Sequence, residues 1–217
     1  MQLYTHEESG NSYKVRLLVS FLGIAVEERR VDLMTDEQHG AEFLALNPRG
    51  EVPVLVDGDL VLADSAAILV YLAGKHPGGG WWSEEPDEQA EIVQWLAFAA
   101  SWVQYGVFTA RAVVSFGIPA NGLPADFPHD VLAEARIRGE KSLAILDRHL
   151  AVNDWLALGG PTIADIAVFP YVALAPMGDI ALTPYPHVEA WIARFRALPR
   201  FVAIAGLDDP HYRRPAS

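Results

Sequence analysis

The chain has 217 residues, 51% of them hydrophobic, and a formal net charge of −12 at pH 7. This length and hydropathy predict one large globular domain or two small ones around a sizeable core. The acidic balance argues against nucleic acid and anionic membranes as partners, because both are bound through basic patches. The absence of cysteine excludes disulfide bonds, a cysteine nucleophile and cysteine ligands to a metal, so thiol chemistry must use the thiol of a ligand.

Residues 1–8 do not combine a basic segment with an apolar one, so we expect no signal peptide and a cytoplasmic protein. The most apolar segment, residues 166–178, is shorter than the roughly 20 residues that span a bilayer, and it contains Pro170 and Pro176. These features predict a buried, kinked helix and no contact with a membrane.

The first elements along the chain are predicted to be a strand and a helix. Residues 2–5 alternate apolar and polar side chains, and residues 8–12 supply a turn and a helix cap, with Ser9 and Ser12 as the candidate caps. Gly23 stands where the helix should end. The helix is predicted from apolar side chains at the spacing of one buried face: Val15, Leu18, Val19 and Leu22.

A second strand and a less regular connection follow. Residues 26–33 alternate imperfectly and predict a strand, whereas residues 35–46 are helix-like but polar and poorly periodic. The turn-forming residues 47–50 stop this connection and lead into a hairpin.

Residues 51–57 form the stretch around which the N-terminal half is expected to be organised. Alternating valines predict a strand, yet Pro53 cannot donate a hydrogen bond within a sheet, so it lies at an edge or follows a cis peptide bond. Pro53 also favours an extended Val52, whose N–H and C=O would pair with an extended peptide. A turn at residues 57–59 should return the chain as a second strand.

A helix is predicted to begin directly after this hairpin. Apolar side chains recur at helical spacing from Ala66 onward, so Ser65 is expected to be the N-cap. The N–H groups and the positive dipole end at such a cap bind carboxylates. Residues 77–80, Pro-Gly-Gly-Gly, should end the helix.

Only helical patterns follow. Residues 92–110 and 132–150 each predict a helix with one apolar face, and residues 116–128, which contain three prolines, predict a loop between them. Thr162-Ile163-Ala164-Asp165 is a capping signature before an almost wholly apolar helix, which should be the core of this half.

This change of pattern predicts two domains. We expect an α/β domain at residues 1–77, with the order βαβ, α, ββα, and an all-helical domain at residues 88–206. Residues 78–87 would be the linker between them, and residues 207–217 a polar tail.

Motifs for several common chemistries are absent. The sequence has no phosphate-binding glycine loop, no nucleophile elbow and no zinc-protease motif. The seven histidines show no metal-ligand spacing, so no metal is expected and each histidine is taken as a surface or capping residue. The exception that we consider is His39, because a polar helix facing the hairpin would turn it toward a ligand.

The order of these features resembles the cytosolic glutathione S-transferase family over nearly the whole chain. The resemblance is carried by the Ser9-x-x-Ser12-x-x-Val15 helix, the segment from Asn47 to Leu55, Asp64-Ser65, and the capping signature of the helical half. It implies a thioredoxin-like N-terminal domain with a cis-proline, an all-helical C-terminal domain and a homodimer with the active site between domains. It also implies glutathione as co-substrate, in a serine-type member similar to bacterial ones.

The contacts with glutathione are implied by the same resemblance, position by position. Val52 resembles the residue whose backbone pairs with the cysteinyl part of glutathione, and Pro53 resembles the cis-proline that exposes it. Asp64 and Ser65 resemble the acidic-serine pair at the γ-glutamyl end, with Asp64 in place of the commoner glutamate. Ser9 matches the serine that donates a hydrogen bond to the glutathione sulfur.

Each candidate also has a purely structural alternative. Ser9 and Ser12 would serve only as helix caps. Asn11 lies where some members with disulfide or peroxide chemistry keep a functional asparagine, but it is equally a turn residue. Arg49 would either bind the glycyl carboxylate of glutathione or be an exposed, solvated residue of a loop. Four aromatic residues would line an electrophile pocket or belong to the core: Trp102, Tyr105, Phe108 and Phe116.

The leading hypothesis is a glutathione transferase that stabilises the thiolate and adds it to an apolar electrophile. A free thiol has a pKa of about 8.5, so lowering that pKa is the main task. Ser9 and the start of the Ser12 helix would both favour the anion. Two alternatives stay open: a glutathione-dependent peroxidase, disulfide reductase or isomerase on the same fold, and a non-catalytic module that binds a partner.

Overall fold

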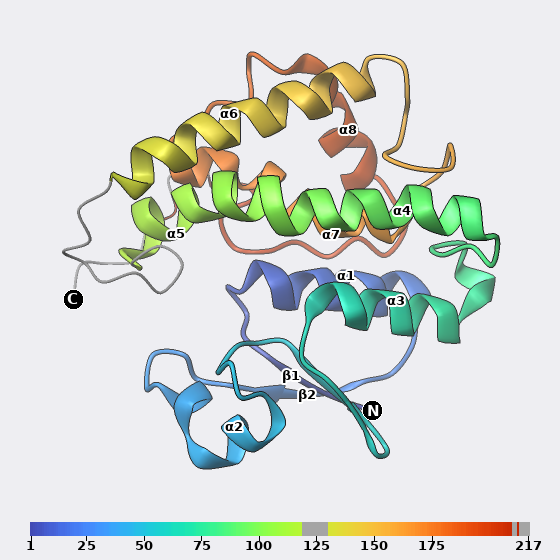
Figure 1. Cartoon of the computed structure of the whole chain (residues 1–217), viewed down its shortest axis with the longest axis vertical. Helices are drawn as coiled ribbons and strands as arrows, with labels where there is room; N and C mark the ends of the chain where they lie inside the picture. The colour runs from blue at the N-terminus through green and yellow to red at the C-terminus, as the bar shows by residue number, and fades with distance from the viewer. Residues whose placement is uncertain (119–129, 210–211, 213–217) are drawn as a thin grey trace.

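A computed structural model describes residues 1–118, 130–209 and 212. Its N-terminal part contains a four-stranded sheet with the strand order β2-β1-β3-β4 (Figure 1). Strands β1 and β2 are parallel, whereas β3 runs antiparallel to both of its neighbours. The strands are β1 (Gln2–Thr5), β2 (Glu27–Arg30), β3 (Val54–Asp57) and β4 (Leu60–Leu62).

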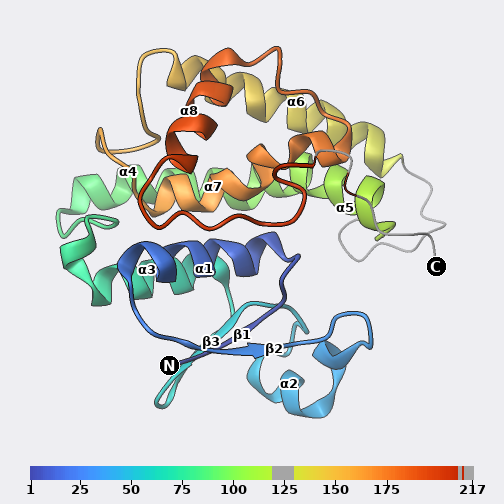
Figure 2. The same ribbon diagram turned by 180° about the vertical axis from the view of Figure 1, so that it is seen from behind.

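Helices cover both faces of this sheet. Helices α1 (Gly10–Leu22) and α3 (Ser65–Lys75) lie between the sheet and the helical part, and α2 (Ala41–Leu46) lies on the opposite face (Figures 1 and 2). The order βαβ, α, ββα agrees with the prediction and makes the N-terminal part thioredoxin-like. The N-terminal cap Ser9 and the left-handed Gly23 bound α1, as its sequence pattern indicates.

Three elements of the N-terminal part differ from their predicted extent. The second strand covers only residues 27–30, and all four of its side chains are exposed. The helix predicted at residues 35–46 is split into a 3-10 turn, η1 (Glu37–His39), and α2, because Gly40 between them has an extended backbone. The strand predicted at residues 51–57 begins at Val54, since Pro53 has no N–H to donate to the sheet.

The second part is helical, as predicted. One continuous helical run comprises α4 (Pro86–Phe98), a π-helix η3 (Ala99–Phe108) and α5 (Thr109–Phe116). Short 3-10 turns are η2 (Pro77–Gly79) and η5 (Ala175–Gly178), and the remaining helices are α6 (Val131–Leu150), α7 (Ile163–Ala173) and α8 (Pro186–Arg196). Most of the predicted loop and most of the predicted polar tail lie outside the described residues. Across the described ranges, every helix is too short or too polar to cross a bilayer.

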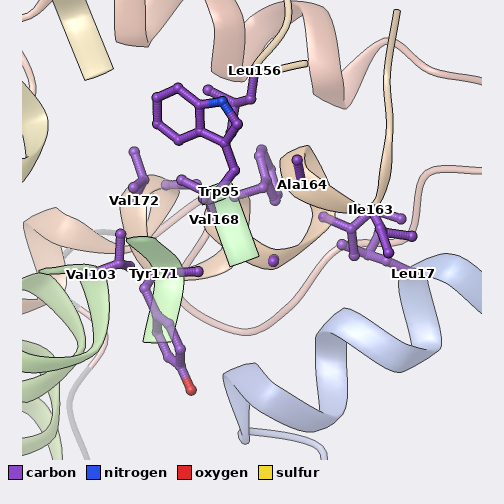
Figure 3. Packing of buried hydrophobic residues seen from close by; sticks show 14 of the residues in the cluster. Leu17, Trp95, Val103, Leu156, Ile163, Ala164, Val168, Tyr171 and Val172 are labelled. Atoms are coloured by element: carbon purple, nitrogen blue, oxygen red, sulfur yellow. The ribbon is translucent and has the colours of Figure 1, made fainter. Parts of the chain in front are cut away.

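Helix α7 is the centre of the molecule. Every residue of α7 is buried, including Pro170, which confirms the predicted buried helix, and the short turn η5 follows it. Its N-terminus carries the predicted capping box of Thr162 and Asp165. Figure 3 shows α7 side chains, among them Val168 and Tyr171, packed between Trp95 of α4 and the helix α1.

Two hydrophobic clusters position the candidate site. The larger cluster joins α1 and α3 to the helical part through α7, so both parts share one core. A smaller cluster of Val31, Phe43, Val52 and Val54 lies between the sheet and α2. Because Val52 belongs to that cluster, the backbone before β3 is held firmly in place.

Candidate functional site

A cavity of about 580 Å³ lies between the two parts of the molecule. Its N-terminal wall comprises the loop before α1, the segment before β3 and the start of α3, and its other wall comprises η3, α5 and Tyr171 of α7. Most of the predicted site residues line it: Ser9, Asn11, Arg49, Val52, Asp64, Ser65, Tyr105, Phe108 and Phe116. Four predicted residues are not part of its lining: Ser12, His39, Pro53 and Trp102.

Ser9 lies on the cavity wall at the start of α1. Its Oγ accepts a hydrogen bond from the backbone N–H of Ser12 at 3.2 Å, so Ser9 is the N-cap. That bond uses a lone pair and leaves the hydroxyl hydrogen available to an anion. Ser12 is fully buried, and its Oγ accepts the backbone N–H of His6 at 3.4 Å. Of the two candidate caps, only Ser9 faces the cavity.

Asn11 and Lys14 form a pair on the same side of α1. Lys14 Nζ donates to Asn11 Oδ1 at 2.9 Å, and both residues line the cavity. The Lys14 side chain is buried, which lowers its pKa to about 8, against the opposing effect of the Asp64 charge. The burial of Lys14 was not predicted, because a charged side chain carries no apolar periodicity that would place it on a buried face.

The segment before β3 presents the backbone of Val52 to the cavity. The Val52-Pro53 peptide bond is cis, as one of the two predicted alternatives required. The buried Asn47 shapes the preceding turn by donating to the Glu51 carbonyl at 2.7 Å and accepting from the Arg49 N–H at 3.1 Å. Val52 takes part in no backbone–backbone hydrogen bond with any described residue.

At the start of α3, the structure corrects the prediction that Ser65 is the N-cap. The cap is Asp64, whose Oδ1 accepts the N–H groups of Ala66 at 2.8 Å and Ala67 at 3.3 Å. Ser65 is the first helical residue, because an aspartate caps a helix as well as a serine does. The Arg49 guanidinium donates to the Ala63 carbonyl at 2.6 Å and lies 3.7 Å from Asp64 Oδ2, so it links the loop before β3 to the start of α3.

The aromatic wall is shaped by the π-helix η3. In a π-helix, hydrogen bonds run from i to i+5, so each residue turns the chain by about 80° instead of the about 100° of an α-helix. Residues five apart therefore share a face, and Tyr105 reaches the cavity together with Ala100. Trp102 points elsewhere: it lines a shallow groove with Lys141 and Tyr185. Trp102 was predicted to line the same pocket as Tyr105, but it is not part of the cavity lining.

His39 is paired outside the cavity. Its Nδ1 lies 2.6 Å from Asp36 Oδ1, and its side chain is about half exposed. The ring packs on Gly50, where an added Cβ would lie 2.5 Å from the imidazole. His39 therefore supports the loop before Val52 and does not face the ligand side.

Besides Lys14, two buried polar side chains line the cavity and were not predicted, His6 and Arg111. His6 is buried, contrary to the expected surface or capping role, and its Nδ1 lies 3.0 Å from the Val31 carbonyl. Since a carbonyl oxygen only accepts, Nδ1 carries a hydrogen. Arg111 is also buried, donates to the Glu8 carbonyl at 3.3 Å and lies over the Phe116 ring at 4.7 Å. It places a positive charge beside the aromatic wall.

Comparison with known proteins agrees with this architecture. Residues 1–74 match the family model "Glutathione S-transferase, N-terminal domain", and residues 109–199 match "Glutathione S-transferase, C-terminal domain". The chain is 32% identical over 174 residues to Glutathione S-transferase F10 of Arabidopsis thaliana, which covers 78% of this chain and 80% of that protein. It is also 29% identical over 210 residues to a "Probable maleylacetoacetate isomerase" of Vibrio cholerae, covering 96% of each.

Solved structures show the same arrangement. A glutathione S-transferase of Xanthobacter autotrophicus Py2 matches with a TM-score of 0.83 and 33% identity, over 96% of this chain and 98% of that one. A glutathione transferase family member of Pseudomonas fluorescens Pf-5, with two glutathione molecules bound, matches with a TM-score of 0.78 and 27% identity, over 92% and 89%. Fold and cavity thus define a thioredoxin-like domain joined to a helical domain. The chain belongs to the glutathione S-transferase family.

Proposed function

We propose that this protein binds glutathione in the cavity, stabilises its thiolate and transfers it to an apolar electrophile. The observation that carries the proposal is the composition of the cavity wall. Polar groups suited to a peptide, at Ser9, Val52 and Ser65, share one cavity with the aromatic residues Tyr105 and Phe108. A volume of about 580 Å³ is within the range of about 300–1,000 Å³ typical of small-molecule sites.

In this proposal, glutathione lies extended along the segment before β3. The Val52 N–H and C=O would pair with the cysteinyl residue as an added strand does. The γ-glutamyl carboxylate would bind the Ser65 hydroxyl and the N–H groups of the first turn of α3, and Asp64 would face the γ-glutamyl ammonium group. Arg49, on the same wall, would meet the glycyl carboxylate.

The cysteinyl thiol would then reach the start of α1. The Ser9 hydroxyl would donate a hydrogen bond to the sulfur while its oxygen keeps the cap bond from Ser12. A donor and a helix N-terminus both favour the anion, so the thiol pKa falls and the nucleophile becomes more abundant at neutral pH. With an aryl halide, the thiolate forms the carbon–sulfur bond, halide leaves, and the thiol proton goes to solvent.

A glutathione-dependent isomerase is the second candidate. Two observations favour it: the relative named as a probable maleylacetoacetate isomerase and the buried Arg111 on the cavity wall, which suits a substrate with a carboxylate. Such an enzyme would return a product with the composition of its substrate. From family membership we further propose a cytoplasmic homodimer with domains at residues 1–77 and 88–206.

Product analysis tests the proposal. The purified protein is applied to immobilised glutathione, then incubated with glutathione and either an aryl chloride or an unsaturated cis-dicarboxylic acid. We expect retention and a thioether product from the aryl chloride, and the same result for Ser101→Ala, whose hydroxyl bonds the Ala97 carbonyl outside the cavity. An isomer with unchanged mass as the sole product would establish the second candidate. A folded protein that is neither retained nor active would overturn both.

A further inference from the structure

Lys14 is a buried cation on the cavity wall that the proposed function does not yet use. The residue is only 5% exposed. Its Nζ donates to Asn11 Oδ1 at 2.9 Å and lies 4.9 Å from the centre of the Tyr171 ring. Both neighbours are neutral, since burial raises the pKa of the Tyr171 phenol. No carboxylate of the described residues forms an ion pair with Lys14, and the Asp64 charge acts on it from a longer distance.

A buried ammonium group of this kind favours an anion as its neighbour. Burial disfavours the charged form more than the Asp64 charge favours it, and the Lys14 pKa is therefore lowered to about 8. An ammonium group also has three donors, and only one of them is directed to Asn11. An anion bound in the cavity would accept a second hydrogen bond and supply the counter-charge.

The position of Lys14 points to the sulfur end of glutathione. Lys14 is bonded to Asn11, which lies two residues after the cap Ser9 on the same helix. The Tyr171 ring beneath Nζ also packs on Gly10, where an added Cβ would lie 2.4 Å from the ring. The ammonium group and Gly10 in the first turn of α1 therefore lie against the same ring, and the cap Ser9, one residue before Gly10, lines the same cavity.

We propose that Lys14 is a second thiolate-stabilising residue, whose ammonium group supplies the positive charge while Ser9 supplies a hydrogen bond. This inference rests on the proposed function, because it requires glutathione bound with its sulfur beside Ser9. Lys14 exchanges no proton in this role: the thiol proton leaves to solvent, and the lysine is an ammonium group before and after. A charge at short range acts on the thiolate and has no effect on the neutral thiol.

The test separates the thiolate from the carboxylates of glutathione. The pKa of the bound thiol is followed by thiolate absorbance in the wild type, Lys14→Met and Arg16→Met, and the Kd of S-methylglutathione, which has no ionisable thiol, is measured for each. Methionine keeps the apolar stem of the lysine without its charge. Arg16 is the matched control, because it lies on the same helix, donates to the Glu7 carbonyl at 2.7 Å and does not line the cavity.

We expect Lys14→Met to raise the pKa of the bound thiol by about one unit or more, which leaves about tenfold less thiolate at neutral pH. The Kd of S-methylglutathione should stay unchanged, and Arg16→Met should change neither quantity. Equal losses of affinity for glutathione and S-methylglutathione would assign Lys14 to a carboxylate and overturn the inference. An unchanged thiol pKa in Lys14→Met would overturn the inference alone. A wild type that binds neither ligand would overturn the proposed function with it.

Discussion

Asp64 and Ser65 are adjacent at the start of α3 but have different roles, one as the helix cap and the other as part of the cavity wall. Asp64 accepts two backbone N–H groups and caps the helix, whereas Ser65 lies on the cavity wall and takes no part in the cap. The cap therefore holds the helix start in place, and the hydroxyl beside it stays available to a ligand. Helix stability and ligand affinity should respond to different substitutions.

Ser65→Ala is expected to raise the Kd of glutathione about ten- to hundredfold, because a hydrogen bond to a carboxylate is worth about 1.5–3 kcal/mol. Its free energy of unfolding should stay within about 0.5 kcal/mol of the wild type. Asp64→Ala, in contrast, should lower the free energy of unfolding by about 0.5–2 kcal/mol through loss of the helix cap. Calorimetric titration and denaturant unfolding measure both quantities. Loss of stability in Ser65→Ala with unchanged affinity would restore the cap role to Ser65.

Lys14 links function to stability through its ionisation. Burial lowers its pKa to about 8, whereas a lysine in the unfolded chain has a pKa of about 10.4. Between these values the unfolded chain binds more protons than the native protein, so the Lys14 contribution to the free energy of unfolding rises with pH. Below about pH 8 the buried charge lowers the stability of the native protein.

Lys14→Met should therefore be more stable than the wild type at pH 7, by up to about 3 kcal/mol, less what the bond to Asn11 contributes. The difference should shrink as the pH rises from about 8 to about 10. Urea unfolding of both proteins at pH 7 and at pH 10 measures it. A variant that is less stable than the wild type at pH 7 would show that Lys14 stabilises the native fold.

Among the helices and strands, those that could be predicted have start and stop signals in their own sequence, within one or two helical turns of the end that they mark. Gly23 ends α1, and the Thr162-Asp165 capping box begins α7, as the sequence pattern indicated. The π-helix η3 has no such signal, because its apolar residues fit an α-helix equally well, and nothing in the sequence separates Trp102 from the aromatic residues that line the cavity. His6, Lys14 and Arg111 were missed because nothing in the local pattern distinguishes a buried polar residue from an exposed one.

The geometry of η3 makes a testable distinction between two of its aromatic residues. Phe108→Ala should lower kcat/KM for an aryl electrophile by about tenfold or more, since a buried aromatic side chain contributes about 1.5–3 kcal/mol. The KM of glutathione should change little. Trp102→Ala, from the same helix but outside the cavity, is the matched control and should behave as the wild type. Steady-state kinetics with varied electrophile measure both variants. A loss of kcat/KM in Trp102→Ala with no loss in Phe108→Ala would contradict the placement of these two residues.

At the scale of the whole molecule, α7 ties both parts into one core. Its capping residue Asp165 is buried and accepts hydrogen bonds from three N–H groups: that of Thr162 at 2.9 Å, that of Leu156 at 3.1 Å and Trp191 Nε1 at 2.9 Å. These bonds join the start of α7 to the preceding loop and to α8. Because α1 and α3 pack on α7, the position of the cavity walls depends on this junction.

Asp165→Ala should destabilise the protein by about 3–5 kcal/mol, because it leaves three buried donors without their acceptor. Both parts should unfold together, in one transition, since they share a core. Fluorescence and far-UV circular dichroism during denaturation monitor the two parts. Two separate transitions, or a loss below about 1 kcal/mol, would contradict the central role of this junction.

The ionisation of bound glutathione tests the proposed mechanism most directly. Thiolate absorbance is followed against pH in the saturated complexes of the wild type, Ser9→Ala and Asn11→Ala. In the wild type, we expect a thiol pKa at least about one unit below the value of about 8.5 of a free thiol, and Ser9→Ala should raise it by about one to two units. A shift in Asn11→Ala alone would move the role to Asn11. A pKa that stays near 8.5 in the saturated wild type would contradict thiolate stabilisation in this cavity.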